Sequence, residues 1–488
     1  MKTPKTIVWG LFCLCIACAD AGKSHNALIG FERPPKNIII FIADGAGFNH
    51  FNSADYYQCG RTPCQPYESL PAEASAKVGF PVRLAMSTYP AGGGYDANAA
   101  WADFDYVKKG CTDSAAAVTA MAAGIKTDNG ALGVDVNGNP VPNLVERAEQ
   151  LGKSTGVVTS AHFTDATPAG FVAHNISRNN YIEIAAQMVN QSAVDVVMGC
   201  GHPFYNADGK PDKTPHYKYI DKSTWTGLAS GSAGSDADGD GTPDHWTFVQ
   251  TRNEFQKLMT GPTPKRVFGL AQVFTTLQED RSGDAHSPPY KVPFTQTVPT
   301  LEEMTKAALN VLDEDPDGFF LMVEGGAIDW TGHSNESGRL IEEMDDFNKS
   351  IEAVIHWVNT NSNWDETLVI ITADHETGYL TGPGSGPLPT GPARGELVEP
   401  VWNKLVGDGP GNLPTMEWHS KGHTNSLVPF FAKGQAAESF ENTVDGLDPV
   451  HGPYIDNTDL ANVIFSLWSK SAHKKTGPLS HWPAKIQL

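Results

Sequence analysis

Four short segments of this 488-residue chain carry side chains that could bind divalent metal ions and act on a phosphate ester. They are Asp44-Gly45, Asp113-Ser114, Glu324 with Asp329 and His333, and Asp374-His375. Three of them directly follow an apolar run rich in β-branched or aromatic residues, such as residues 38–42 or 368–371. Open α/β sheets place their chemistry where buried parallel strands end. The sequence therefore predicts one site at the carboxyl edge of a parallel sheet.

Ser114 is the candidate nucleophile. It opens an alanine-rich run to Ala123 that predicts a helix. The free N–H groups and the dipole at a helix N-terminus favour a developing alkoxide and an incoming phosphate. For an isolated Asp-Ser pair, an ordinary N-cap serine is the alternative. The other carboxylates and imidazoles of the set favour the nucleophile.

Metal binding is indicated by the grouping of acidic residues and histidines. Asp329 and His333 stand four residues apart, which places both side chains on one face of a helical turn, as a divalent metal requires. A single Asp-His pair is more typical of a solvated or capping pair. Several such residues at strand ends, without compensating basic residues, favour a metal site.

The surrounding pattern predicts an α/β fold. Apolar runs indicate strands at 38–43, 154–159, 318–323 and 367–372, and helices are expected at 114–123, 301–312 and 340–358. Residues 205–290 are polar and rich in Gly, Pro and Asp, which indicates an insertion. The Gly/Pro-rich stretch 381–414 is expected to form a loop or small cap near the site.

Charge and the N-terminus limit the function classes. The formal net charge of −21, without a basic run, argues against nucleic acid or an anionic membrane as partner. Residues 1–21 resemble a signal peptide, with Lys2 and Lys5 before an apolar stretch at 7–19, and predict export to the periplasm, the cell surface or the medium. Lipidation of Cys18 and ordinary cleavage after Ala19 or Ala21 both remain open.

The remaining cysteines fit an oxidising compartment. Cys59 and Cys64 are close enough in sequence to close a small disulfide loop. Cys111 and Cys200 are expected to stay free or to pair with each other.

Seven short stretches resemble the motifs of the alkaline phosphatase family and occur in the family's order. They are Ile42-Ala43-Asp44-Gly45, Thr112-Asp113-Ser114-Ala115-Ala116, residues 129–134, Asp165-Ala166-Thr167-Pro168, Val323-Glu324-Gly325, Thr372-Ala373-Asp374-His375 and Gly422-His423-Thr424. The resemblance covers roughly residues 37–434, within an expected catalytic domain at 37–470. It implies a three-layer α/β/α sandwich with a large, mostly parallel central sheet and loop-rich insertions.

The resemblance also implies a role for each matching residue. Ser114 would be the phosphorylated nucleophile, and Arg178 would bind two phosphate oxygens. One Zn²⁺ would be bound by Asp329, His333 and His423, and a second by Asp44, Asp374 and His375. A Mg²⁺ would use Asp44, Thr167 and Glu324, with Asp165 orienting its waters.

This chain departs from the family pattern near the nucleophile and near the phosphate. Cys111 and Val118 replace an aliphatic and a small residue. Because Trp330 follows Asp329 and Asp165 is acidic, no cation from these positions would reach phosphate. His419 is an alternative to His423 as a zinc ligand, and His423 is favoured by the apolar run that follows Thr424.

A separate acidic stretch resembles the start of a calcium loop. Asp236, Asp238, Asp240 and Asp244 alternate with other residues around turn glycines. Thr247 stands where such a loop carries a bidentate Glu. A structural Ca²⁺ and a solvated acidic loop are both open readings.

The leading hypothesis is an exported alkaline phosphatase that hydrolyses small-molecule phosphate monoesters through a phosphoserine, with a lipid anchor and a homodimer as further possibilities. A phosphodiesterase or nucleotide pyrophosphatase on the same scaffold is the enzymatic alternative. A non-catalytic metal-binding protein of the cell surface is the alternative from another class.

Overall fold

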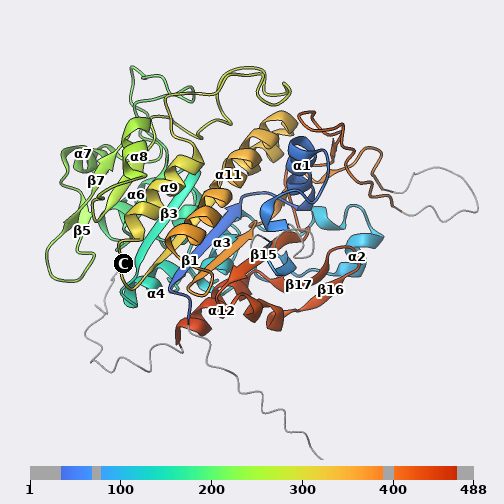
Figure 1. Ribbon diagram of the computed structural model, residues 1–488, viewed down its shortest axis with the longest axis horizontal. Coiled ribbons are helices and arrows are strands. Elements are labelled where there is room, and N and C mark those ends of the chain that lie inside the picture. Colours follow the sequence, from blue (N-terminus) through green and yellow to red (C-terminus); the bar gives the residue numbers. More distant parts are fainter. Residues whose placement is uncertain (1–33, 69–78, 388–399, 470–488) are drawn as a thin grey trace, which may run out of the picture. The chain divides into compact units, whose positions relative to one another are not determined.

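A computed structural model describes residues 34–68, 79–387 and 400–469 of the chain (Figure 1). The predicted signal peptide at residues 1–21, with Cys18, lies outside the described residues. Residues 388–399 of the expected cap segment also lie outside them. None of the described helices is long and apolar enough to cross a membrane.

Eleven strands form one sheet in the order β16-β17-β2-β15-β10-β1-β9-β3-β4-β8-β7. All pairings from β10 to β7 are parallel, whereas β15 is antiparallel to both of its neighbours. The predicted large, mostly parallel sheet is therefore confirmed. Its strands are β1 (Asn37–Ala43), β2 (Val82–Ser87), β3 (Ser154–His162), β4 (Val196–Cys200), β7 (Thr247–Val249), β8 (Val267–Leu270), β9 (Phe319–Gly325), β10 (Thr367–Thr372), β15 (Val428–Gly434), β16 (Gly446–Asp448) and β17 (Gly452–Asp456).

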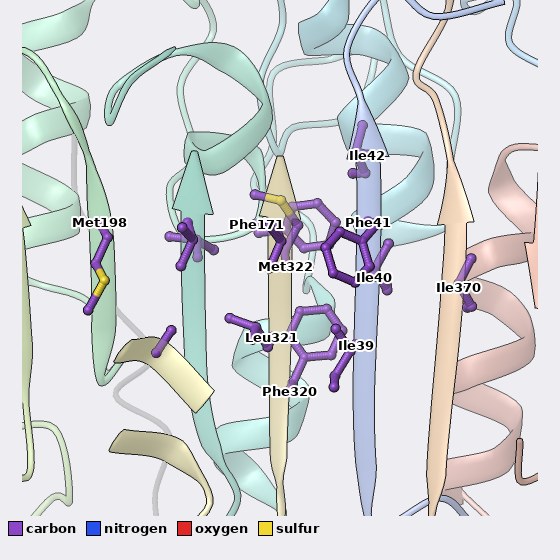
Figure 2. Packing of buried hydrophobic residues seen from close by; sticks show 14 of the residues in the cluster. Ile39, Ile40, Phe41, Ile42, Phe171, Met198, Phe320, Leu321, Met322 and Ile370 are labelled. Atoms are coloured by element: carbon purple, nitrogen blue, oxygen red, sulfur yellow. The ribbon is translucent and has the colours of Figure 1, made fainter. Parts of the chain in front are cut away.

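Helices cover both faces of this sheet. In Figure 1, α9 and α11 cross in front of it, and Figure 2 shows further helices behind the central strands. On the rear side, α12 packs against α3 and α4. The helices are α1 (Phe48–Cys59), α2 (Ala97–Ala102), α3 (Ser114–Ala123), α4 (Leu144–Gln150), α5 (Ala166–Gly170), α6 (Tyr181–Asn190), α7 (Lys222–Ser230), α8 (Arg252–Leu258), α9 (Leu301–Leu312), α10 (Ala327–Ser334), α11 (Ser337–Asn361) and α12 (Thr458–Ser469).

The central strands are apolar on both sides because helices cover both faces. All seven residues of β1 are buried. Ile39, Ile40 and Phe41 belong to one hydrophobic cluster with Phe320 and Leu321 of β9 (Figure 2). This uninterrupted apolar filling makes the strands rigid supports. The polar residues at their carboxyl ends are consequently fixed in position.

The predicted elements agree with the observed ones apart from their ends; β9, for example, ends at Gly325 rather than at residue 323. Helices 114–123 and 301–312 and the strand 367–372 have the predicted bounds. β3 continues to His162, and α11 begins at Ser337 and ends at Asn361. Both extensions carry polar residues that are buried by contacts with distant segments, which a local pattern does not reveal.

The stretch 205–290 is partly regular. It contains α7, α8 and the short strands β7 and β8, and a two-stranded hairpin is formed by β5 (Gly234–Ser235) and β6 (Asp244–His245). β8 pairs with β4 and β7 pairs with β8, so this stretch also extends the central sheet. Strands of three or four residues are too short to give a clear alternation in the sequence.

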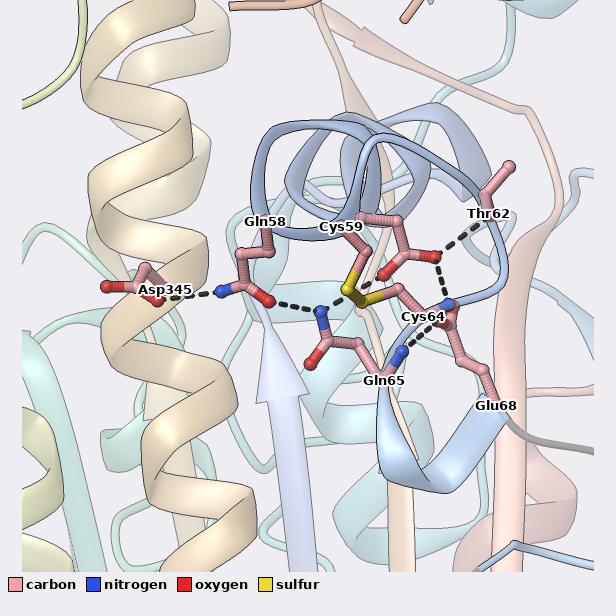
Figure 3. Close-up of a disulfide and its surroundings, with 8 residues drawn as sticks. Gln58, Cys59, Thr62, Cys64, Gln65, Glu68 and Asp345 are labelled. Atoms are coloured by element: carbon pink, nitrogen blue, oxygen red, sulfur yellow. Dashed lines mark hydrogen bonds between the residues drawn. A yellow bond between two sulfur atoms is a disulfide. The ribbon is translucent and has the colours of Figure 1, made fainter. Parts of the chain in front are cut away.

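Cys59 and Cys64 form a disulfide at the end of α1, and Cys111 and Cys200 are free (Figure 3). The enclosed loop also has a polar network. The backbone N–H of Cys64 donates to Asp55 at 3.0 Å, and Gln65 bridges Asp55 to Gln58. Gln58 in turn donates to Asp345 of α11 at 2.7 Å. The loop therefore ties α1 to α11.

We expect that replacing both Cys59 and Cys64 with serine will lower the free energy of unfolding by roughly 2 kcal/mol, the loop-entropy contribution of a short closed loop. Denaturant unfolding of the double variant and the wild type, both with metals bound, measures this. Since the loop lies at the far end of α1 from the strand ends, turnover should be retained. An unchanged free energy of unfolding would show that the polar network alone holds the loop.

Candidate active site

The predicted site residues meet at the carboxyl ends of three adjacent strands. β1 lies between β10 and β9 in the sheet. Asp44 follows β1, Asp374 follows β10, and Glu324 stands near the end of β9. Parallel strands end at the same edge, so residues far apart in sequence, such as Asp44 and Asp374, become neighbours.

One group of ligand-type atoms comprises Asp44, Asp374 and His375, whose candidate atoms all lie within 4.8 Å of one another. All three residues are buried. Ser114, the first residue of α3, places its Oγ 3.2 Å from His375 Nε2. The predicted nucleophile therefore borders this group.

Gly45 permits the close approach of these strand ends. Its φ of +76° lies in the left-handed region, and a Cβ there would be 2.7 Å from the Asp329 backbone. Its N–H donates to Asp374 Oδ1 at 3.0 Å. Any larger residue would push Asp44 and Asp329 apart.

A second group comprises Asp329, His375 and His423, again within 4.8 Å. His333 Nε2 lies 3.2 Å from Asp329 Oδ2 and 3.1 Å from His423 Nε2. His375 stacks on His423 with ring centroids 3.6 Å apart. The two groups are thus contiguous, and His375 lies between them.

The three imidazoles have their second nitrogen fixed by a hydrogen-bond partner. The Nδ1 of His333 lies 2.6 Å from the Lys421 carbonyl, and that of His423 lies 2.9 Å from the Thr112 carbonyl. The Nδ1 of His375 lies 3.2 Å from Thr377 Oγ1. All three Nε2 atoms therefore face the carboxylates, which is the orientation of metal-ligating histidines with outer-shell support.

The predicted magnesium residues also come together. Glu324 is buried and accepts a hydrogen bond from Thr159, and Thr167 is buried in α5. Four fully buried oxygens of this region make no hydrogen bond within the described part of the chain: Asp44 Oδ1, Asp374 Oδ2, Glu324 Oε1 and Thr167 Oγ1. Unpartnered buried oxygens are costly unless a ligand satisfies them, so the residues present fit divalent cations.

The electrostatics of the protein alone show the same need for positive charge. Burial, reinforced by Asp374 and Asp329, raises the pKa of Asp44. Burial and Asp165 raise the pKa of Glu324 to about 8, and burial raises that of Asp374 to about 6. Without a cation, these carboxylates therefore compete to remain protonated.

Arg178 lies beside the nucleophile's helix. Its Nη1 is 3.2 Å from Asp113 Oδ2 and its Nη2 is 3.0 Å from Asp165 Oδ1. Burial would lower the pKa of Arg178, but Asp165 and Asp113 outweigh it and raise that pKa. Two carboxylates thus fix the plane of a guanidinium that stays charged.

His419 occupies a different place from His423. Its Nε2 is 2.7 Å from Thr381 Oγ1, and its ring packs edge-on against Phe104. His423, in contrast, lies in the second group of ligand-type atoms. The choice of His423 over His419 agrees with this geometry.

The acidic stretch 236–244 brings together Asp236, Asp238 and Asp244, which are exposed or half-buried. Asp240 is not in this group, and its Oδ1 accepts the N–H of Thr242 at 2.7 Å. The ammonium of Lys265 lies 3.2 Å from Asp238 and 3.4 Å from Asp244. A lysine already neutralises part of the group, and the calcium loop stays a prediction.

Sequence reasoning missed the residues that support the ligand-type groups. Thr377 donates to Asp329 Oδ1 at 2.5 Å, and Thr159 donates to Glu324. His162, at the end of β3, lies 3.6 Å from Asp165 Oδ2. Of these residues, only Thr377 could have been found from the sequence. It stands two positions after His375, and in an extended segment such residues point to the same side.

Comparisons with known proteins point to one family. The alkaline phosphatase family profile matches residues 35–393. Alkaline phosphatase 4 of Bacillus subtilis (strain 168) is 29% identical over 500 residues, covering 92% of this chain and 91% of that protein. Alkaline phosphatase 3 of the same strain is 32% identical over 358 residues, covering 72% of this chain but only 63% of that relative.

Solved structures show the same fold. The alkaline phosphatase from the Antarctic bacterium TAB5 is 24% identical with a TM-score of 0.57, covering 90% of this chain and 99% of that one. A cold-active alkaline phosphatase from Shewanella sp. is also 24% identical, with a TM-score of 0.59, covering 88% and 99%. The chain belongs to the alkaline phosphatase family, and its family and relatives support a phosphomonoester hydrolase.

Metal removal should make the protein less stable as the pH rises. In the metal-free protein the pKa values of Glu324 (about 8) and, through its hydrogen bond with Asp329, His333 (about 9) are raised, and that of Asp44 is raised as well. A group whose pKa is higher in the folded than in the unfolded protein stabilises the fold at low pH. This stabilisation is lost as the pH rises through the folded pKa. We therefore expect the unfolding temperature in EDTA to fall by a few degrees between about pH 7 and about pH 9.

Several buried histidines act in the opposite direction at lower pH. Burial lowers the pKa values of His375, His162 and His50, among others, so their cost disappears once the pH exceeds the value for free histidine. Above about pH 7 these histidines are largely neutral in the folded and the unfolded protein, so they add little to the pH dependence. With zinc and magnesium added, the same scan should be flatter, and an equal slope with and without metal would contradict cation binding by these carboxylates.

Proposed function

We propose that this protein is an exported alkaline phosphatase that hydrolyses phosphate monoesters through a phosphoserine at Ser114. The observation that carries the proposal is the juxtaposition of Ser114 Oγ, 3.2 Å from His375, with buried carboxylate oxygens that lack partners. The fold and the family support a phosphatase. The nucleophile, the metals and the substrate class are our inference.

The ligand-type residues fit two Zn²⁺ and one Mg²⁺. Asp329, His333 and His423 would bind one zinc, and Asp44, Asp374 and His375 the other. Asp44, Thr167 and Glu324 would bind magnesium, with Asp165 beside them. In support, a mutant of the TAB5 alkaline phosphatase has been described with magnesium bound in a site named M3.

The chain's own residues define the reaction. Ser114 Oγ would lose its proton to solvent and attack phosphorus, and the ester oxygen would leave with the bonding pair and take up a proton. Water would later attack the phosphoserine, release inorganic phosphate and restore the Ser114 hydroxyl. The N-terminus of α3 favours negative charge at Ser114. Bound divalent cations would supply Lewis-acid stabilisation of the attacking and leaving oxygens. Arg178, oriented by Asp113 and Asp165, would bind two nonbridging phosphate oxygens as a planar fork.

The wider predictions follow from this assignment. The phosphatase would be exported by the segment 1–21, with a lipid anchor on Cys18 as an alternative to simple cleavage. A homodimer and a structural Ca²⁺ at residues 236–244 are further expectations. Cell fractionation and elemental analysis of the purified protein measure these.

Ser114→Ala should lower turnover by several orders of magnitude while leaving the fold and the metal content unchanged, because only the attacking hydroxyl is lost. Mass spectrometry of acid-quenched wild type should show one phosphoserine, at residue 114. Thr119→Ser, another buried hydroxyl on the same helix, is a control that should keep the phosphoenzyme. A phosphoserine trapped elsewhere would exclude Ser114 as the nucleophile.

Arg178→Ala should weaken monoesters more than diesters. A monoester dianion has three nonbridging oxygens to share between the metals and the guanidinium, whereas a diester has only two and carries one negative charge less. Charge-assisted bonds worth roughly 1.5 to 3 kcal/mol correspond to about a ten- to hundredfold loss of kcat/KM for p-nitrophenyl phosphate.

Bis-p-nitrophenyl phosphate provides the comparison for this variant. Arg147→Ala, at a half-buried position of α4, removes an equal charge away from the site and should leave both substrates unaffected. A wild type that prefers the diester, or an Arg178→Ala variant that loses both activities equally, would favour the phosphodiesterase.

A further inference from the structure

The stretch 205–290 reaches the candidate site through Tyr219. The ring of this buried tyrosine stacks on His162, with centroids 3.9 Å apart and an interplanar angle of 19°. His162 Nε2 lies 3.6 Å from Asp165 Oδ2, and Asp165 binds Arg178. A continuous set of contacts therefore joins this stretch to the residue that would bind phosphate.

Three aromatic rings surround His162 and form a wall on the β3 side of the site. Trp330, the residue after Asp329, meets His162 edge-on at 6.4 Å between centroids, and Tyr181 does so at 5.3 Å. Tyr181 and Tyr219 are 5.4 Å apart. Trp330 and Tyr181 are half-buried, so part of the wall faces solvent.

Lys218 places an ammonium on this wall. Its Nζ donates to Tyr219 Oη at 3.0 Å and lies 4.7 Å from the Tyr219 ring centroid and 5.8 Å from that of Tyr181. The faces of both aromatic rings attract the ammonium through cation–π interactions. Lys218 is exposed, and among the described residues no carboxylate lies within ion-pair distance of it.

The acidic groups that act electrostatically on the neighbouring Tyr219 include Asp165 and Asp280, and both are already engaged. Asp165 binds Arg178, and Asp280 accepts a hydrogen bond from Thr275 at 2.6 Å. The ammonium is therefore available to an anion from outside the protein.

We propose that Lys218, Tyr181 and Trp330 form a leaving-group subsite that favours monoesters whose leaving group carries a second anionic group. This inference rests on the proposed phosphomonoesterase function. Trp330 directly follows Asp329 and meets His162, so the wall borders the second group of ligand-type atoms. Arg178 would be engaged with the transferred phosphate, whereas Lys218 would be free to bind a second anion on the leaving group.

A matched pair of substrates tests the subsite. Phenyl phosphate and 4-carboxyphenyl phosphate differ only in a carboxylate on the leaving group. Wild type should show a higher kcat/KM for the carboxylated ester. Lys218→Gln should lower that kcat/KM by about three- to tenfold and leave phenyl phosphate unchanged, with added salt reducing the preference of the wild type.

Lys213→Gln is the control, because it removes one exposed positive charge from the same segment. Tyr219→Phe, which keeps the ring but removes the hydroxyl that holds Lys218, should show an intermediate loss. Equal losses for both esters in Lys218→Gln, or the same loss in Lys213→Gln, would overturn the subsite. A wild type that hydrolyses neither ester would instead contradict the phosphomonoesterase function.

Discussion

Repulsion among buried carboxylates is the constraint on which the site depends. Asp44, Glu324 and Asp374 end three neighbouring parallel strands, and burial together with repulsion from nearby carboxylates raises the pKa of each. A fold that brings them together without cations bears a cost that increases with pH. The apolar strands behind them, buried on both faces, supply the rigidity that holds the arrangement.

Asp329 is the exception within the group. Although burial favours its neutral form, a hydrogen bond to His333 and the charges of His423 and His375 outweigh burial and lower its pKa. His333 and His423 lie around Asp329, whereas His375 lies between the two groups, with its Nε2 3.1 Å from Asp374 Oδ2 and 3.6 Å from Asp44 Oδ1. Protein groups therefore lower the pKa of Asp329, whereas the pKa values of Asp44 and Glu324 stay raised.

Much of this architecture could be predicted from the sequence because it is local. The alanine-rich run at 114–123 predicts its helix, and the apolar run at 367–372 predicts its strand. The acidic residues that follow such apolar runs mark the strand ends. The roles given to those residues depended on a family resemblance. Thr159 and Thr377 were missed because their partners are far away in sequence and a lone threonine has no distinctive pattern. Asp113 was singled out, but its contact with Arg178 was not predicted, for the same reason.

The acidic Asp165 and the aromatic Trp330 change what surrounds the phosphate position. Since Trp330 offers no charge, Asp165 has Arg178 and His162 as its partners. His162 is held by Tyr219, so a residue from a polar stretch without clear periodicity takes part in orienting Arg178. Burial lowers the pKa of His162 to about 4, so the imidazole is neutral near neutral pH and leaves the full charge of Arg178 for Asp165 and Asp113. If Arg178 binds an oxyanion as proposed, the stretch 205–290 would influence that binding without contacting the oxyanion, because Tyr219 stabilises the one neutral partner among the charged ones.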